Sequence, residues 1–275
     1  MKISIVTLSF NQAPFLESAI RSVVDQQGVD LDYIVVDPGS NDDSREIIGR
    51  YDSQIGQTVF ERDDGPADGL NRGFARATGD IYGFLNADDV LRPGALAEVA
   101  RAFERDPEAD VISANGHIID ADGAPVRRIY SDRFSLWGYL YGGVVLLQQS
   151  TFFRASAFEA AGGFNVDNRT CWDGELWLDI ALAGRRFQRA SGFWSGFRVY
   201  DGTVTSGIHG DDHHRRAYER DRRRMFMKAR GRVPGGLKDK GQRIAARVVK
   251  WGSNPVALSA RVASLMSPKV RRSAI

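Results

Sequence analysis

The segment Asn86-Ala87-Asp88-Asp89 combines an amide and two carboxylates directly after Ile81–Leu85, an apolar run typical of a buried strand. A helical pattern follows, with Pro93 in its expected first turn. Carboxylate and amide oxygens at the end of a strand are suited to Mg²⁺ or Mn²⁺. The segment therefore predicts a divalent-metal site, and the alternative is that Asp88 or Asp89 caps the helix that follows.

Asp37 stands at the end of a second apolar run, residues 32–37, and Gly39 after it would let a ligand approach the backbone. A carboxylate here can accept hydrogen bonds from a base N–H or a ribose hydroxyl, whereas an Asp in an ordinary turn needs no ligand. The chain has no Gly-x-Gly-x-x-Gly after its first strand and no Walker motif. These absences argue against a dehydrogenase and a P-loop protein.

A polar turn over residues 63–73 leads into a helix predicted for Ala67–Ala77. Asp68 falls in the first turn of that helix, where negative charge is favoured with or without a ligand. Asn71 and Arg72 follow within a turn, and we expect both to reach a ligand over the edge of the sheet. This turn is therefore a further candidate for substrate contact.

Asp173 and Glu175 lie two residues apart at the start of a predicted helix, next to Trp172. A carboxyl that faces a cleft beside an indole ring has a raised pKa and can act as a general base. The alternative is that both acids only place negative charge at a helix N-terminus, where it is favoured. The pair therefore supplies a candidate base, with its assignment still open on the pattern alone.

Three histidines, His209, His213 and His214, lie close together before an arginine-rich helix predicted over residues 215–224. Imidazole nitrogens are common metal ligands, and His209 is a candidate for that role. The other interpretation is a solvated loop that leads into the basic helix, and the spacing alone favours it.

Strands and helices alternate along the first 115 residues, which predicts a doubly wound, mostly parallel α/β sheet. We expect strands at residues 2–9, 32–37, 58–62, 81–85 and 109–114, and helices at 13–25, 42–52, 67–77 and 93–105. Ligands of such sheets bind at the carboxyl ends of the strands. Those ends are Thr7–Asn11, Asp37–Ser40, Arg62–Gly65 and Asn86–Asp89, which are rich in small, polar or acidic residues.

The pattern changes after residue 115. Asp122-Gly123 predicts a hairpin between residues 118–120 and 125–130, and residues 144–153 form an extended apolar run. A helix is predicted over residues 172–182, and strands over 187–190 and 193–200. Because no repeat or low-complexity tract intervenes, we expect residues 1–227 to form one domain with two halves, 1–115 and 116–227.

Charge is distributed unevenly along the chain, whose net charge is +2. Residues 228–275 contain twelve Lys and Arg and one acid, Asp239, a charge of +11, so residues 1–227 carry 2 − 11 = −9. A nucleic-acid-binding protein would instead carry its basic stripe on the folded body. The acidic body is better suited to hold a cation, and the basic tail to meet an anionic partner.

The location of the protein is predicted from what the chain contains. It has no apolar run of about eighteen residues that would span a membrane. Residues 1–6 read as a first strand and not as a signal peptide. Cys171, the one cysteine, cannot form an internal disulfide, which favours a reducing cytoplasm.

The tail over residues 228–275 has an amphipathic helical pattern. Ile244, Val248 and Trp251 fall at i, i+4 and i+7, Leu258, Val262 and Leu265 repeat that spacing, and basic residues occupy the other faces. This pattern is typical of a helix in a membrane interface, so we expect peripheral contact with the anionic inner face of a plasma membrane. The alternative is a helix that packs on the body or on a second subunit of a homo-oligomer.

The order and spacing of these segments closely resemble glycosyltransferase family 2, over about residues 2 to 205. The likeness is carried by residues 6–11 (VTLSFN), 34–42 (IVVDPGSND), the helix of residues 68–79 and residues 84–89 (FLNADD). Residues 148–153 (QQSTFF) and 172–178 (WDGELWL) continue it. No single motif is diagnostic, but their order is specific.

The resemblance implies a GT-A fold and inverting, single-sugar transfer from a UDP-, GDP- or TDP-linked sugar to a cell-surface glycan or lipid-linked acceptor. Residues 1–115 would then bind the nucleotide sugar, and residues 116–227 the acceptor. On this template Asp88 ligates the metal and Asp173 is the catalytic base. Donor contacts fall on Thr7, Ser9, Asn11, Asp37, Gly39, Asp68, Asn71, Arg72, Asn86, Ala87 and Asp89, with Gln148, Trp172, Glu175 and His209 as candidates for metal or acceptor contact.

Several residues depart from the family pattern. Asn86 stands where many members carry Asp, Trp172 where Glu is common, and Tyr200 where His is frequent. These departures leave open a second function, a non-catalytic sugar-nucleotide-binding or scaffold protein. A sugar-1-phosphate nucleotidyltransferase would need a basic, glycine-rich first loop, which residues 9–12 do not provide. The Gln-x-x-Arg-Trp motif of processive synthases is also missing.

Overall fold

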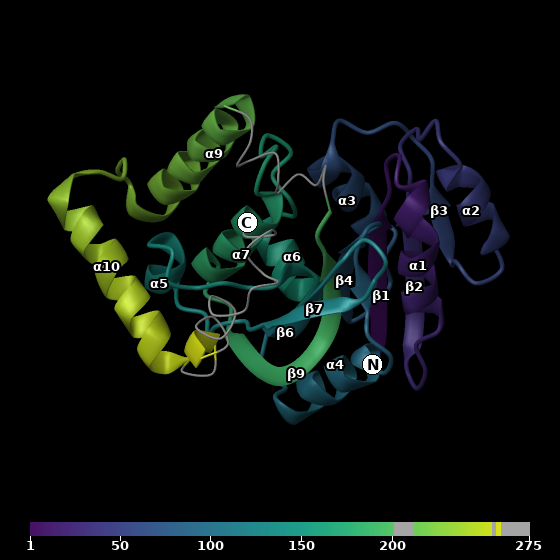
Figure 1. The fold of residues 1–275 in the computed structure, drawn as a ribbon, viewed down its shortest axis with the longest axis horizontal. Helices are drawn as coiled ribbons and strands as arrows, with labels where there is room; N and C mark the ends of the chain where they lie inside the picture. The colour runs from purple at the N-terminus through teal and green to yellow at the C-terminus, as the bar shows by residue number, and fades with distance from the viewer. Residues whose placement is uncertain (201–211, 255–256, 260–275) are drawn as a thin grey trace.

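The computed structural model describes residues 1–200, 212–254 and 257–259 of the chain. The first half contains β1 (Lys2–Leu8), α1 (Ala13–Val24), β2 (Asp30–Val36), α2 (Ser44–Arg50), β3 (Gln57–Val59), α3 (Pro66–Phe74), β4 (Ile81–Asn86), β5 (Val90–Leu91) and α4 (Ala95–Arg105). The predicted alternation of strand and helix is therefore confirmed, with ends that move by one to three residues. Figure 1 shows these elements gathered on one side of the molecule.

The second half completes the sheet and adds helices at the opposite side (Figure 1). It contains β6 (Val111–Ile119), β7 (Pro125–Ile129), α5 (Leu136–Leu140), the 3-10 helix η1 (Gln148–Ser150), β8 (Thr151–Arg154), α6 (Ala155–Ala161), α7 (Trp172–Leu182), β9 (Phe187–Arg198), α9 (Asp212–Arg230) and α10 (Gly236–Ser253). The predicted hairpin is β6–β7, and the predicted helix over residues 172–182 is α7. Strands predicted separately over residues 187–190 and 193–200 form the single strand β9.

One sheet runs in the order β3-β2-β1-β4-β8-β6-β9-β5, with β7 paired to β6. Its amino-terminal part, β3 to β4, is parallel throughout. β8 is antiparallel to both β4 and β6, whereas β9 runs parallel to β6. The chain is thus mixed α/β with a curled sheet, as predicted for a GT-A fold. Residue 115, the expected boundary between halves, lies inside β6, because that strand crosses the centre of the sheet.

Helices cover both faces of the sheet because apolar side chains alternate along its strands. Ile3 and Ile5 of β1 pack with residues of α1, α2 and α4 on one face. Val6 packs with residues of α3, α6 and α7 on the other. α3 approaches closely through Gly73, where an added Cβ would lie 2.5 Å from Val6 Cγ1. This contact holds the carboxyl-terminal part of α3 against β1, and Gly69 packs in the same way on Leu8.

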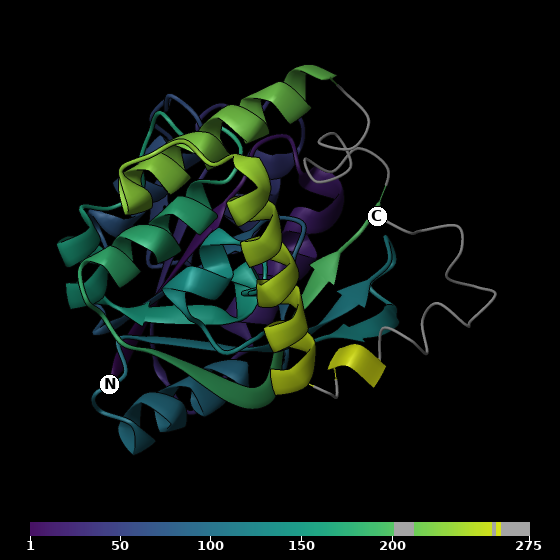
Figure 2. The same cartoon turned by 90° about the vertical axis from the view of Figure 1, so that its left-hand side faces the viewer.

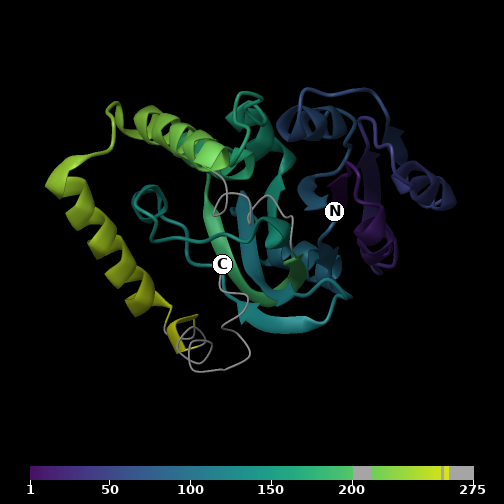
Figure 3. The same ribbon diagram turned by 45° about the horizontal axis from the view of Figure 1, so that its top comes forward.

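The helices α9 and α10 lie beside α5 and α7, at the side opposite the parallel strands (Figure 3). Their core contains Leu140, Leu178, Met225, Phe226 and Ala246. The boundary predicted between residues 227 and 228 falls inside α9, because the same helix buries Met225 and continues to Arg230. Within the described residues, no helix is long and apolar enough to cross a membrane.

Candidate active site

A cavity of about 530 Å³ opens at the carboxyl edge of the sheet. It brings together side chains that are far apart in the sequence: Asn86 at the end of β4, Asp88 in the turn after it, Gln148 of η1, and Trp172 and Asp173 at the start of α7. These five residues were all predicted from the sequence as site candidates. Ligands of α/β sheets bind at this edge, so the cavity is the candidate active site.

Asp88 lies in the turn between β4 and β5. The strand β5 separates it from α4, which begins at Ala95 after Gly94 in a left-handed conformation. The alternative that Asp88 caps that helix, and the expectation that Pro93 opens it, are therefore wrong. Oδ2 of Asp88 accepts a hydrogen bond from the Tyr200 hydroxyl at 3.1 Å. Burial raises the pKa of Asp88, and that hydrogen bond lowers it by less.

Asp89 is turned away from the cavity. Its side chain is buried, its Oδ1 accepts from the backbone N–H of Arg198 at 2.9 Å, and its Oδ2 accepts from Gln149 Nε2 at 3.2 Å. Burial and the neighbouring charge of Asp88 raise the pKa of Asp89 well above the usual value. This carboxyl joins the end of β9 to η1. The expected contact between Asp89 and the donor sugar stays a prediction.

The turn after β4 offers one acid to a metal ion. Within the described residues, no group of three or more His, Cys, Asp and Glu side chains could hold a cation by itself. His209 lies outside the described residues, as do Val262 and Leu265 of the tail. A hard divalent ion that keeps waters and takes phosphate oxygens from a substrate needs only one or two protein carboxylates. Asp88 fits a site of that kind, because a cation would offset the cost of its burial.

Asp173 lies in the first turn of α7 and is partly buried. Burial raises its pKa, and the backbone N–H groups of Gly174 and Asp173 lower it by less. Next to it, the indole Nε1 of Trp172 is buried and has no hydrogen-bond partner among the described residues. An acid with a raised pKa beside an unpaired donor in one cavity is an arrangement expected at a catalytic site.

Glu175, two residues further along α7, has a structural place instead. Its carboxylate is buried and accepts from Asn165 at 2.9 Å, Asn168 at 2.7 Å and Arg224 at 3.0 Å, with Lys228 at 3.5 Å. Burial alone would raise the pKa of Glu175, but these hydrogen bonds together lower it. The oxygens of Glu175 therefore tie α9 to α7, and the expected contact of Glu175 with a metal or acceptor stays a prediction.

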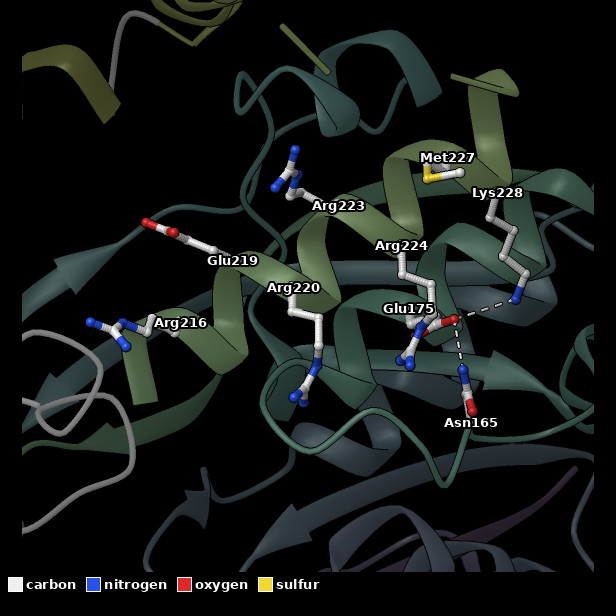
Figure 4. Close-up of a pocket in the computed structure, with 9 residues that line it drawn as sticks. All are labelled: Asn165, Glu175, Arg216, Glu219, Arg220, Arg223, Arg224, Met227 and Lys228. Atoms are coloured by element: carbon white, nitrogen blue, oxygen red, sulfur yellow. Dashed lines mark hydrogen bonds and ion pairs between the residues drawn. The ribbon is translucent and has the colours of Figure 1, made fainter. Parts of the chain in front are cut away.

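Figure 4 shows the surroundings of Glu175, where dashed lines join its carboxylate to Lys228 and to Asn165. Both residues belong to the lining of a second cavity of about 810 Å³. That lining includes five cationic side chains: Arg216, Arg220, Arg223, Arg224 and Lys228. Arg224 and Lys228 are already paired with buried acids of α7. None of the residues that line this cavity also lines the candidate active site.

The expected nucleoside contacts at the ends of β1 and β2 are largely buried. Thr7 Oγ1 accepts from the Tyr33 hydroxyl at 2.9 Å. Asp37 accepts from Ser40 Oγ at 2.6 Å and pairs with Arg45, so its carboxylate is engaged in its own turn. Ser9 Oγ is buried with no hydrogen-bond partner among the described residues. Of these side chains, Ser9 has free hydrogen-bonding capacity.

Asn11 and Gly39 shape the loop next to those strand ends. Both have positive φ, 52° for Asn11 and 143° for Gly39. The Asn11 side chain accepts from the backbone N–H of Asn41 at 2.9 Å, which links the loops after β1 and β2. The two residues fix backbone conformation here, and a ligand contact by either stays a prediction.

The helix α3 holds the remaining predicted donor contacts, Asp68, Asn71 and Arg72. Asp68 accepts from the backbone N–H of Asp64 at 3.0 Å and forms an ion pair with Arg72 at 2.9 Å. Asn71 donates to Phe164 O at 2.8 Å and accepts from Phe164 N at 2.9 Å. Both ends of the Asn71 amide are thus used to hold the loop before α7. Asn71 thus positions this loop, and its expected ligand contact stays a prediction.

Several residues of the site have little signal in the sequence. Phe10 and Gln12 line the cavity, and Phe10 is 58% exposed, an unusual state for so large an apolar side chain. Arg198 is buried, donates from Nε to Asp88 O at 2.7 Å and also bonds the turn after β6. An aromatic at the end of the first strand could have been selected as a ligand contact. Arg198, in contrast, acts by joining segments that are distant in the sequence, the turn after β4 and the turn after β6, so no local pattern reveals it.

Comparison with known proteins identifies the family. A model described as Glycosyl transferase family 2 matches residues 4–160, more than half of the chain. The chain belongs to glycosyltransferase family 2. It is therefore a glycosyltransferase that moves sugar from a nucleotide sugar, as members of this family do.

Curated relatives support the assignment over parts of the chain. An uncharacterized glycosyltransferase of Nostoc sp. is 36% identical over 126 residues, 45% of this chain and 38% of that protein. One of Mycobacterium tuberculosis is 30% identical over 189 residues, 66% of this chain and 69% of the relative. A Campylobacter jejuni GalNAc(5)-diNAcBac-PP-undecaprenol beta-1,3-glucosyltransferase is 34% identical over 100 residues, 35% and 32% of the two chains. The chain thus spans well under half of two of these relatives.

Solved structures share the fold at low sequence identity. A mannosyltransferase of Pyrobaculum calidifontis, in complex with GDP-Man and Mn²⁺, superposes with a TM-score of 0.63 and 18% identity, over 96% of this chain and 75% of that one. S. aureus TarS in complex with UDP gives a TM-score of 0.60 at 18% identity, over 90% and 79%. Both likenesses confirm the predicted GT-A fold.

Proposed function

We propose that this chain is an inverting transferase that moves one sugar from a nucleoside-diphosphate sugar to an acceptor hydroxyl, with Asp173 as the base. The observation that carries the proposal is that one cavity contains both the partly buried acid of α7 and the acidic turn after β4. A raised pKa suits Asp173 to take a proton at near-neutral pH. The diphosphate belongs at Asp88, on the strand-end side of the cavity.

The transfer then follows from these positions. Asp173 accepts the proton of the acceptor hydroxyl, and that oxygen attacks the anomeric carbon from the face opposite the diphosphate. The bond between the anomeric carbon and the diphosphate oxygen breaks, and the nucleoside diphosphate leaves with its electron pair. Trp172, whose indole N–H is unpaired, donates to an acceptor or sugar oxygen and orients it.

Asp88, with Asn86 and Gln148 beside it, would hold a Mn²⁺ or Mg²⁺ ion against the donor phosphates. Asn86 Nδ2 donates to Gln148 Oε1 at 3.4 Å, and Gln148 donates to Phe84 O at 2.7 Å, so the two amides are held against each other at the end of β4. When bound, the ion supplies Lewis-acid stabilisation of the leaving diphosphate. The Tyr200 hydroxyl, which donates to Asp88 Oδ2, also lies 3.3 Å from Gln12 Oε1.

A glycan or a lipid-linked glycan is the acceptor class we propose. One relative is named as a glucosyltransferase of an undecaprenol-linked glycan, and another as a putative teichuronic acid biosynthesis glycosyltransferase of Bacillus subtilis. The cavity combines apolar side chains, Phe10, Leu147 and Trp172, with polar ones, which suits a sugar ring stacked beside hydrogen-bonding groups.

The test begins with donor binding. A thermal-shift screen of UDP-, GDP-, TDP- and CDP-sugars with Mn²⁺ should raise the unfolding midpoint for one nucleotide class, because a ligand that binds only the folded state stabilises it. The selected donor is then incubated with acceptors, and release of the nucleoside diphosphate is measured together with the anomeric configuration of the product by NMR. Retention of configuration would contradict a single displacement with Asp173 as base.

The second candidate, a non-catalytic sugar-nucleotide-binding protein, is favoured by the departures at Asn86 and Trp172. It predicts the same thermal shift and no turnover with any donor and acceptor pair. The unpaired indole N–H of Trp172 and the raised pKa of Asp173 in one cavity favour catalysis, because a scaffold has no need of either.

A further inference from the structure

The helix α10 is attached to the body by its polar and small residues. Gln242 Oε1 accepts from Trp137 Nε1 at 2.6 Å, and Lys250 Nζ pairs with Asp132 Oδ2 at 3.1 Å. Asp239 is buried and accepts from the exposed Arg232 and from the Tyr141 hydroxyl. Ala246 is buried against Gly143, where an added Cβ would meet Ala246 O at 2.6 Å. Positions 239, 242, 246 and 250 share one face of a helix, so that face is the docked one.

The opposite face of α10 carries large apolar side chains into solvent. Leu237 is 86% exposed, Ile244 64% and Val248 65%, and their spacing places them on one stripe, about 140–180° from Asp239 at 100° per residue. Val249 beside it is 56% exposed. A helix that packs on a protein normally buries such residues and exposes its polar ones. This helix does the reverse, so its apolar stripe has no place in the protein's own core.

Nothing in the described part of the chain covers the stripe. Figure 2 shows α10 crossing the near side of the molecule with no other described element in front of it. Figure 3 places the same helix at the outer edge, beyond α5. An exposed apolar stripe of this kind marks a surface for a partner or a membrane.

Charge on α10 determines which partner fits. The exposed charged residues of the helix are all basic: Lys238, Lys240, Arg243 and Arg247. Its one acid, Asp239, is turned inward and paired with Arg232. A second copy that docked through the same face would bring two sets of cations together, which disfavours a symmetric dimer here. A surface that is apolar inside and anionic outside complements the stripe and its cations.

We propose that α10 is a docked, inside-out amphipathic helix whose outer face binds an anionic lipid bilayer. Leu237, Ile244 and Val248 enter the boundary between headgroups and acyl chains, and the flanking Lys and Arg contact anionic headgroups. Because the inner face stays bonded to α5 and its neighbouring loops, the helix holds the catalytic body at the membrane in a fixed orientation. This inference is independent of the proposed reaction.

The test is vesicle co-sedimentation of the full chain with phosphatidylcholine vesicles that contain or lack phosphatidylglycerol. The variant Leu237→Ser/Ile244→Ser/Val248→Ser removes the stripe at exposed positions. The matched control, Val126→Ser/Val166→Ser/Leu182→Ser, removes three exposed apolar side chains elsewhere. We expect the stripe variant to bind anionic vesicles at least about ten-fold more weakly than wild type, and the control to bind as wild type. Arg243→Gln should weaken binding by about five-fold, and only with anionic vesicles.

Three outcomes would overturn the proposal. The first is that wild type does not bind anionic vesicles, and the second is that the stripe variant binds as well as wild type. The third is that light scattering shows a dimer that the stripe variant converts to a monomer while vesicle binding is unchanged, which would assign the stripe to a second copy. Circular dichroism and the unfolding midpoint of each variant, expected to match wild type, exclude loss of the helix as the cause.

Discussion

Replacing Asp173 by Asn is expected to abolish turnover while it leaves donor binding intact. The amide keeps the shape of the side chain in the first turn of α7 but cannot take the acceptor proton. General-base catalysis contributes about 10²–10⁴-fold, or about 2.7–5.4 kcal/mol of transition-state stabilisation. We therefore expect kcat to fall by at least about 100-fold, with a thermal shift by the nucleotide equal to that of wild type.

The pH profile gives the same prediction a second readout. Burial raises the pKa of Asp173, so the protonated, inactive form persists to higher pH than for an ordinary carboxyl. Wild-type kcat/KM should rise with pH through that raised pKa, and the acidic limb should vanish from the residual activity of Asp173→Asn. Activity is measured as nucleoside diphosphate release. Asp167→Asn, an exposed acid in the preceding loop, is the control. An Asp173→Asn enzyme with more than a tenth of wild-type kcat would refute the assignment.

Three further predictions concern the framework of the site. Glu175→Gln should lower the free energy of unfolding by about 1–3 kcal/mol in urea titrations at pH 7. The loss is smaller than for a fully buried ion pair because Arg224 and Lys228 are partly exposed. The control Glu159→Gln, on the surface of α6, should change the free energy of unfolding little. The pKa of Glu175 is lowered in the folded state, so ionised Glu175 stabilises the fold at a pH above the unfolded-state pKa. This stabilisation is lost as the pH falls through the folded-state pKa. A loss of stability in Glu175→Gln that is as large at low pH as at pH 7 would argue against this role. Gly73→Ala should lower the free energy of unfolding by about 1–3 kcal/mol, because the added Cβ would lie 2.5 Å from Val6 Cγ1. Gly49→Ala, with open space around the position, should be neutral or stabilising. Equal effects of the two substitutions would contradict the close packing of α3.

The sequence predicted most of the fold for a clear physical reason. Parallel strands buried on both faces are continuous apolar runs, and the helices between them show a regular period, so β1, β2, β4 and α7 were recognisable. The start of α4 was not, because Pro93 is a good first-turn residue and the two-residue strand β5 gives no periodicity. β9 was divided in two because Ser191 and Gly192 interrupt its apolar pattern.

The residues of the candidate site were predicted less completely than the fold. Asp88 and Asp173 were selected from strand-end and helix-start positions, and the structure places both in one cavity. Asp89 and Glu175 are acids in similar positions, and Asn71 was selected on α3, but the side chain of each is bonded within the protein. Side-chain direction depends on tertiary partners, Arg198 for Asp89 and Phe164 for Asn71, that no local pattern reveals. The inside-out orientation of α10 was equally hidden, since an amphipathic pattern does not say which face docks.

We propose that the cavity at the end of β4 is the donor site. A crystal structure with Mn²⁺ and the nucleoside diphosphate selected in the thermal-shift screen tests this directly. Anomalous scattering locates the metal without reference to the fold. We expect a Mn²⁺ peak against the Asp88 carboxylate, with the diphosphate on it and Asp173 facing the sugar side of the cavity. A metal peak elsewhere, or a nucleotide bound among the arginines of α9 with the cavity at Asp88 empty, would contradict it.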